Sequence, residues 1–248
     1  MIIKMLESIS KKNHAFNFRV ILLILSFIFL FWQDIPAIQK NSLETITYDI
    51  SPLGSSVYND YGKVELYGKQ VNLVTFKTSV FGFNDLETIY SDVSTDLPIR
   101  VEREISFLLH DEYIEESYFP EVGKLIIEKF EGTKKVEEFN FKANGPIHNA
   151  IILPFSLRRV PDLNIGWSLD VRLPDEFKVT LTSIEEVVVP AGTFETYHFT
   201  SQPEKFEIWI TTDSLRIPVK IKGCGGMNYT LSMMKRTLKE DNEKETKK

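Results

Sequence analysis

The chain has 248 residues, of which 43% are hydrophobic and 26% charged, and its formal net charge is −6. This is the composition of a globular protein, so it excludes a chain that is disordered throughout. The acidic balance argues against nucleic acid as the main partner, and the single cysteine excludes an intrachain disulfide and any multi-cysteine metal site.

An uncharged apolar run near the N-terminus, residues 20–32 (VILLILSFIFLFW), follows a flank of four basic residues and one acidic residue. This order is typical of a secretory signal, with the positive flank in the cytoplasm. As a helix, the run spans about 20 Å, which is shorter than the roughly 30 Å hydrocarbon core of a bilayer. Phe16 and Phe18 could lengthen it into an uncleaved anchor. A cleaved signal and a retained anchor both remain open.

Both alternatives predict a cytoplasmic flank and export segment over residues 1–37 and an exported domain over 38–234. The domain then lies in the periplasm or is held at the inner membrane by residues 20–32. Four of the 29 basic and two of the 35 acidic residues lie in residues 1–37, so the rest of the chain carries −8. An anionic domain is repelled by anionic lipid headgroups, so docking on a bilayer needs a local basic or apolar patch.

A period of two dominates the exported part, where β-branched and aromatic residues alternate with polar ones between turn signals. Short strands at this spacing predict an antiparallel meander, curled into a half-barrel, an open barrel or a sandwich. The fold class is therefore mainly β. The expected strands are residues 46–50, 64–67, 71–80, 86–93, 100–109, 113–119, 124–130, 136–142, 168–173, 178–189, 194–200, 205–211, 216–222 and 229–233.

Two segments depart from the strand pattern. Residues 149–160 (NAIILPFSLRRV) do not alternate and are followed by Pro161, so they predict one short helix, with 154–159 as its regular part. Residues 235–248 (KRTLKEDNEKETKK) are nearly free of apolar groups. Such a segment cannot bury enough surface to offset its ordering entropy, so we expect a charged, disordered tail.

Candidate catalytic and metal-binding residues are few. The sequence contains no HExxH, GxSxG, phosphate loop or dinucleotide fingerprint. His110, beside Asp111 and Glu112, is the nearest approach to a metal cluster, and Cys224, between glycines, is the one conceivable thiol nucleophile. A polar turn and a β-bulge are the commoner explanations of these two patterns. We therefore predict no enzyme, no metal site and no cofactor.

The aromatic residues, which include 18 Phe and 9 Tyr, allow two interpretations. They fill the core of a curled sheet, or some of them line a cavity for an apolar ligand. Phe81 and Phe83, which flank Gly82 beside a turn, are the candidates for ligand-lining residues.

The C-terminal third carries the most specific pattern. Residues 189–194 (VPAGTF) predict a strand, a Pro-led turn and a second strand, followed by 209–213 (WITTD) and 216–220 (RIPVK). This combination resembles the bacterial exported family called domain of unknown function 3108. Weaker matches at residues 48–50, 97–100 and 154–157 extend the resemblance over about 44–234.

The resemblance implies an exported, mainly antiparallel β domain and carries no established activity. It implies an architectural role for the matching residues: Pro190 and Gly192 shape a turn, Trp209 fills a sheet face, and Arg216 is expected to pair with Asp213. The full set is Pro190, Gly192, Phe194, Trp209, Asp213, Arg216 and Pro218.

These observations favour a non-enzymatic envelope protein that binds an apolar or lipid-like ligand, or a protein partner, on a curled β-sheet. A membrane-tethered structural or interaction module without a small-molecule ligand is the alternative. A hydrolase that uses Cys224 or His110 is a third hypothesis.

Overall fold

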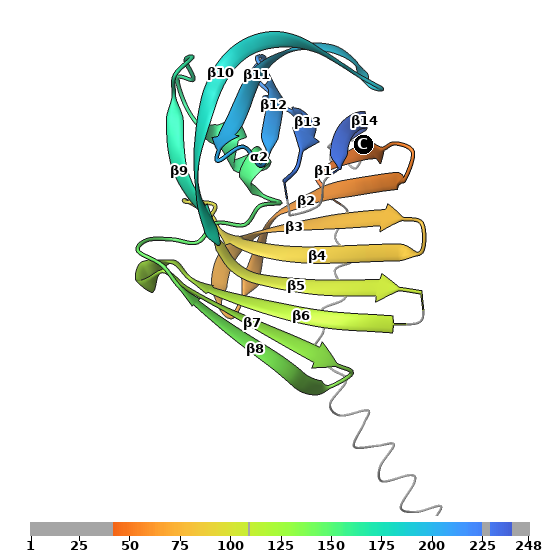
Figure 1. Cartoon of the computed structure of the whole chain (residues 1–248), viewed down its shortest axis with the longest axis vertical. Coiled ribbons are helices and arrows are strands. Elements are labelled where there is room, and N and C mark those ends of the chain that lie inside the picture. Colours follow the sequence, from red (N-terminus) through yellow and green to blue (C-terminus); the bar gives the residue numbers. More distant parts are fainter. Residues whose placement is uncertain (1–41, 109, 225–228, 240–248) are drawn as a thin grey trace, which may run out of the picture. The chain divides into compact units, whose positions relative to one another are not determined.

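The computed structural model describes residues 42–108, 110–224 and 229–239. They form one antiparallel sheet of 14 strands with a short helical segment, so the prediction of a mainly β, antiparallel fold is confirmed (Figure 1). In space the strands follow the order β8-β7-β6-β5-β4-β3-β2-β1-β14-β13-β12-β11-β10-β9. The sheet is not closed into a barrel, because β8 and β9 remain its two edges.

The strand bounds agree with most of the expected ranges. They are β1 (Glu44–Ile50), β2 (Gly54–Leu66), β3 (Lys69–Val80), β4 (Phe83–Asp92), β5 (Pro98–Phe107), β6 (His110–Phe119), β7 (Lys124–Glu131), β8 (Lys134–Lys142), β9 (Ser168–Leu173), β10 (Asp175–Val189), β11 (Gly192–Gln202), β12 (Glu207–Thr211), β13 (Pro218–Lys222) and β14 (Thr230–Leu238). A 3-10 turn, η1 (Pro120–Val122), connects β6 and β7.

Several strands are longer than the sequence predicts, and β2 and β14 extend furthest beyond the expected ranges. β2 begins at Gly54, ten residues before the strand expected from residue 64, and β14 runs four residues into the expected tail. In β14, Arg236 stands opposite Ile46 and pairs with the Glu44 carboxylate. This ion pair and the backbone hydrogen bonds to β1, which a solvated tail would not have, hold residues 235–238 in the sheet. Of the expected tail, only residues 240–248 lie outside the described part of the chain.

The predicted short helix is confirmed as α2 (Leu153–Ser156), continued by the 3-10 turn η2 (Leu157–Arg159). Leu153, Phe155 and Leu157 are buried, so the segment turns an apolar side toward the sheet. The Phe155 ring stacks on Tyr58 of β2, with centroids 3.6 Å apart and planes 7° from parallel. Figure 1 shows α2 enclosed between β9–β13 and the first strands of the sheet. The core therefore includes residues from both halves of the strand order.

A buried hydrogen bond joins two parts of this core. Tyr48, which is fully buried in β1, donates its hydroxyl hydrogen to the Pro218 carbonyl oxygen at the start of β13, at 2.8 Å. Tyr48→Phe should lower the free energy of unfolding by about 1–2 kcal/mol, because a buried carbonyl loses a donor. Urea unfolding of the detergent-solubilised chain measures this. Tyr61→Phe, at a half-buried position in β2, is the control, and an equal loss there would contradict the assignment.

Candidate functional site

The candidate site is the space between the α2–η2 segment and the sheet. Asn149 starts this segment: its side-chain oxygen accepts hydrogen bonds from the backbone N–H groups of Ile151 and Ile152, at 2.9 and 3.2 Å. Asparagine favours such local turns, and Pro154 suits the first helical turn, where its missing N–H is not needed. The segment ends at Val160, whose backbone is extended, before Pro161. Its side chains thereby project over β1–β4.

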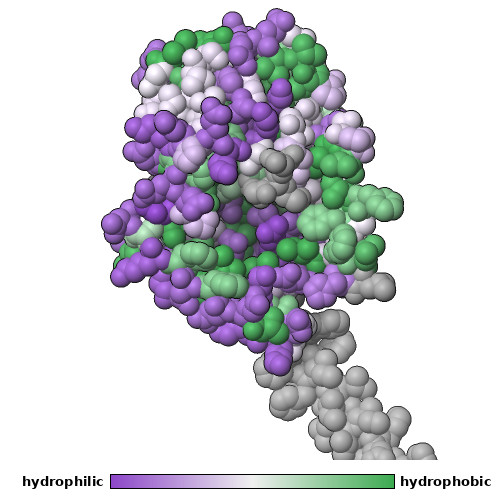
Figure 2. Space-filling model, in the orientation of Figure 1, coloured by the Kyte–Doolittle hydropathy of each residue, from purple (hydrophilic) through white to green (hydrophobic). Residues whose placement is uncertain are grey.

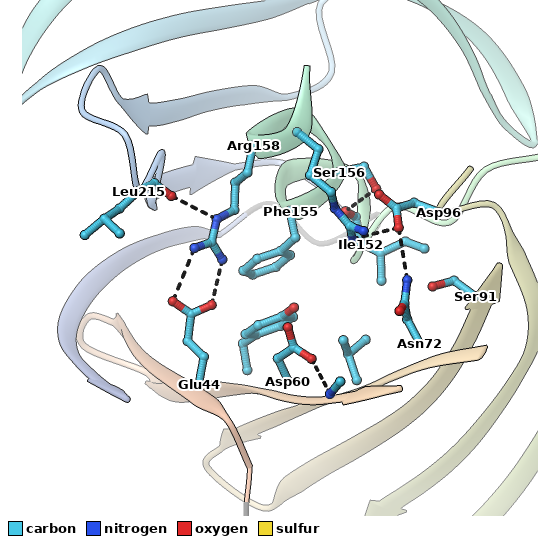
Figure 3. A pocket seen from close by; sticks show the side chains of 14 residues that line it. Glu44, Asp60, Asn72, Ser91, Asp96, Ile152, Phe155, Ser156, Arg158 and Leu215 are labelled. Carbon is cyan, nitrogen blue, oxygen red and sulfur yellow. Dashed lines mark hydrogen bonds and ion pairs between the residues drawn. The ribbon is translucent and has the colours of Figure 1, made fainter. Parts of the chain in front are cut away.

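A charged cavity of about 340 Å³ lies beside this segment (Figure 3). β1, β2 and β3 supply one wall, and α2–η2 supplies the other. In the figure, Phe155 points down between the Arg158 and Asp96 sides of the cavity. The lining residues are Glu44, Tyr58, Asp60, Gly62, Asn72, Val74, Ser91, Asp96, Ile152, Phe155, Ser156, Arg158, Arg159 and Leu215.

Glu44 ties β1 to the helical segment. Its carboxylate accepts hydrogen bonds from Arg158, at 2.6 and 3.3 Å, and from Arg236 of β14. Only 8% of the Glu44 side chain is exposed. Burial alone would raise the pKa of this carboxyl, but Arg158 and Arg236 outweigh burial and hold the pKa below its usual value. Glu44 is therefore an ionised, buried anchor of the cavity wall.

Asp96 forms the other charged side. Its carboxylate lies 2.7 Å from the Arg159 guanidinium and accepts a hydrogen bond from the Asn72 side-chain amide at 3.3 Å. Burial raises the pKa of Asp96, an effect that the positive charge of Arg159 partly offsets. The Arg159 side chain is 58% exposed, whereas that of Arg158 is 18% exposed. Arg159 is thus the more accessible of the two cations in this cavity.

A second cavity of about 460 Å³ adjoins the first and is mainly apolar. Asp96, Ile152, Ser156 and Arg159 line both cavities, so the two share a boundary. The remaining lining residues of the second are Ser94, Thr95, Leu97, Pro98, Pro146, His148, Asn149, Leu153, Leu157, Val160, Pro161 and Leu169. Each volume lies in the range of natural small-molecule sites, roughly 300–1,000 Å³.

A cluster of carboxylates lies on the sheet face that lines the charged cavity, on strands β4 and β6. Asp85 of β4 accepts a hydrogen bond from Arg103 of β5 at 2.8 Å, and Glu87 lies 3.8 Å from the same guanidinium. Burial raises the pKa of Glu87 to about 8; Arg103 opposes this rise, while Asp85 and Glu116 of β6 add to it. Burial also raises the pKa of Glu116. Glu87 is therefore a carboxyl that the fold keeps largely protonated near neutrality.

The predicted ligand-lining residues lie outside both cavities. Phe81, 98% exposed, occupies the β3–β4 hairpin tip, and Phe83 begins β4. Neither contributes to the walls of the two cavities described above. A ligand-lining role for them stays a prediction, and the cavity residues themselves were not among the sequence candidates.

The residues of the C-terminal motif lie in and around β10–β13. Pro190 and Gly192 form the β10–β11 turn, Gly192 has φ 137°, and Phe194 is half-buried. Asp213 accepts hydrogen bonds from the Leu215 and Arg216 backbone N–H groups. The Arg216 guanidinium does not extend to Asp213 and instead donates to the Val160 carbonyl. The expected side-chain pair is thus replaced by a backbone contact, and Arg216 braces the end of η2.

Trp209 lies on the opposite face of β12 from the core residues Ile208 and Ile210, and is 5% exposed. His198 of β11 stacks on it with centroids 4.4 Å apart, and the Lys220 ammonium lies 4.6 Å from its ring centroid. Its indole N–H donates to Glu185 at 2.7 Å. These cross-strand contacts account for a tryptophan on this face of the sheet.

Cys224 and His110 are the residues of the hydrolase hypothesis. Cys224 is buried, and its thiol donates to the Ala150 carbonyl at 3.1 Å. His110 is exposed at the start of β6. Within residues 42–108, 110–224 and 229–239, no group of three His, Cys, Asp or Glu side chains is arranged to hold a metal ion.

Comparisons with known proteins give no family. No family model matches the chain, and no curated protein matches it. The resemblance to the exported family therefore stays a prediction. In the part of the chain that the structure describes, no helix is long and apolar enough to span a membrane. The predicted export segment, residues 20–32, lies outside the described residues.

Proposed function

We propose that this chain is a non-enzymatic binding protein of the cell envelope, and that it holds an amphipathic, lipid-like ligand beside α2–η2. The observation that carries the proposal is the pair of adjoining cavities, one charged and one apolar, that share Asp96, Ile152, Ser156 and Arg159. An amphipathic molecule has two parts of this kind. The apolar chain fits against Leu97, Leu153 and Leu169, and the polar head fits at the shared boundary.

Arg159 favours an anionic head group. Its side chain is half-exposed and lies at the boundary of the two cavities. Among the residues that the structure describes, its guanidinium has one carboxylate partner, Asp96, which leaves donors for a ligand. The open, curled sheet then acts as a half-barrel with the helical segment as its inner wall. The proposal that the domain is exported rests on the sequence of residues 1–37, and the retained form of residues 20–32 would hold it at the inner membrane.

This function is tested by measuring how a fluorescent medium-chain fatty acid binds to the full chain. The chain is kept in detergent, and the fatty acid is used below its critical micelle concentration. Leu169→Trp should weaken binding at least tenfold, because the larger ring fills the apolar cavity. Leu173→Trp, on the same strand but outside the cavity walls, is the matched control and should bind as the parent does. No saturable binding, or equal weakening by both variants, would favour the alternative of an interaction module without a small-molecule ligand.

The charge of the head group has its own test. Arg159→Gln should weaken binding of the fatty acid about tenfold and change the affinity for the corresponding fatty alcohol by less than twofold, since a charge-assisted hydrogen bond is lost only with the carboxylate. Competition against the fluorescent probe measures both affinities. Equal losses for acid and alcohol would contradict recognition of an anionic head by Arg159.

A further inference from the structure

Four large apolar side chains are exposed at three hairpin tips of the sheet. Leu53 lies in the β1–β2 turn and is 58% exposed, Phe81 lies in the β3–β4 turn and is 98% exposed, and Phe107 and Leu108 at the β5–β6 turn are 50% and 75% exposed. We call these four residues the hairpin-tip surface. Figure 2 shows apolar side chains gathered along the right-hand edge, where Figure 1 has the tips of these hairpins.

Backbone contacts hold the three tips side by side. Gly54, next to Leu53, stands opposite Val80, next to Phe81. The Leu108 backbone N–H donates to the Gly82 carbonyl at 3.1 Å, which joins the β5–β6 tip to the β3–β4 tip. The four side chains therefore form one surface on a rigid ladder and are not scattered single residues, which would need no explanation.

The sequence around these tips carries no full charge. Residues 50–57, 78–84 and 105–110 contain no Asp, Glu, Lys or Arg, although 26% of the chain is charged. At the opposite ends of the same strands, the turns over residues 67–69, 92–96 and 120–124 contain Lys69, Asp92, Asp96, Glu121 and Lys124. These three tips are therefore apolar and uncharged, although the next turn at the same end, between β7 and β8, contains Glu131 and Lys134. The turns at the opposite ends of the strands carry charged residues beside the exposed Tyr67 and Val122.

We propose that the hairpin-tip surface inserts into the interfacial layer of a lipid bilayer. Its side chains protrude from turns, and none of them lines either cavity, so their shape suits a soft partner that closes around them. Phenylalanine and leucine are favourable in the bilayer interface. The anionic domain needs an apolar, uncharged patch to approach a membrane, and these tips are such a patch.

Chain length places a bilayer within reach. Nine residues, 33–41, separate the apolar run from Ser42, and they span at most about 30 Å when fully extended. In the retained form, the domain thus stays next to the membrane that holds residues 20–32. The inference goes beyond the proposed ligand function, because its residues are distinct from the cavity residues and its failure would leave ligand binding intact.

Site-specific labelling of the full chain in phosphatidylcholine vesicles tests the inference. In a Cys224→Ala background, an environment-sensitive fluorophore is attached after Phe81→Cys, Leu108→Cys or Tyr67→Cys. Tyr67 is the matched control, because it is 81% exposed at the β2–β3 turn at the opposite end. Labels at 81 and 108 should shift to shorter emission wavelengths and lose at least half their intensity with brominated lipids. The label at 67 should do neither.

A second measurement separates the membrane from other partners. A label after Leu53→Cys should be quenched by brominated lipids, and adding Phe81→Ser and Leu108→Ser should reduce that quenching at least twofold. Because these side chains are exposed, the substitutions leave the core intact, which thermal unfolding checks. Aqueous emission at positions 81 and 108 would overturn the proposal. A blue shift that brominated lipids do not quench would also overturn it and would indicate a second copy or another protein on the tips.

Discussion

Glu44→Gln should lower the free energy of unfolding at pH 7 by about 3–5 kcal/mol. The buried carboxylate neutralises two guanidiniums, those of Arg158 and Arg236, whose side chains are 18% and 19% exposed. Removing one partner of a buried ion pair leaves charge without compensation. The folded protein holds the pKa of Glu44 below the ordinary 4.5, so its contribution is complete above that pH and disappears as the pH falls through the folded value.

Urea unfolding of parent and variant between pH 3 and 8 measures this effect. The difference between them should be largest at neutral pH and should narrow in acid. Glu65→Gln, at an exposed position of β2, is the control and should change the free energy by less than about 0.5 kcal/mol. A difference at pH 7 as small as that of the control would contradict a buried network at Glu44.

Glu87→Gln should have the opposite effect and stabilise the fold by about 2–4 kcal/mol at pH 9. The fold raises the pKa of Glu87 from 4.5 to about 8, chiefly by burial. Between these values the folded chain binds a proton that the unfolded chain has lost, so the stability of the parent falls as the pH rises. Glutamine keeps the shape and cannot ionise, which removes this fall.

The parent and the Glu87→Gln variant should therefore have similar free energies of unfolding below pH 4.5 and diverge up to about pH 8. Glu104→Gln, at an exposed position on the neighbouring strand β5, is the matched control. A Glu87→Gln variant that follows the parent at every pH would show that Glu87 is solvated and ionised in the folded protein. Opposite pH profiles for Glu44→Gln and Glu87→Gln would show that one sheet face holds one carboxyl charged and another neutral.

The parts of the fold that follow from local pattern were predictable. Alternating apolar residues placed most strands, and the unpatterned segment before Pro161 placed α2–η2. β2 was missed over residues 54–63 because its inward positions include Ser56, which pairs with Thr78 by a hydroxyl–hydroxyl hydrogen bond at 2.9 Å. A buried position that holds a small polar residue gives no hydrophobic signal. Ser56 can be recognised as an inward position only once its pairing with Thr78 of β3 is known.

The candidate site was less predictable than the strands, since its residues meet only through topology. Glu44 and Arg158 are 114 positions apart, and nothing in either local sequence indicates the other. Arg236 lies in a segment whose composition predicts a tail. Two aromatics that flank a glycine, as Phe81 and Phe83 do, form a pattern that cannot distinguish a cavity wall from an exposed tip. The strand order, which brings β14 beside β1, determines which of these residues meet.

The pairing of β14 with β1 also determines when the sheet can be completed. Strands β1–β8 pair with their sequence neighbours and can form as the chain emerges where the domain folds, but the free side of β1 has no partner until residues 230–238 have also emerged. During that interval, the backbone groups of β1 are open to pairing with another chain, a recognised route to aggregation. The sheet can therefore be completed only when nearly the whole polypeptide is present. A chain that ends before β14 would leave one side of β1 without a hydrogen-bonded neighbour.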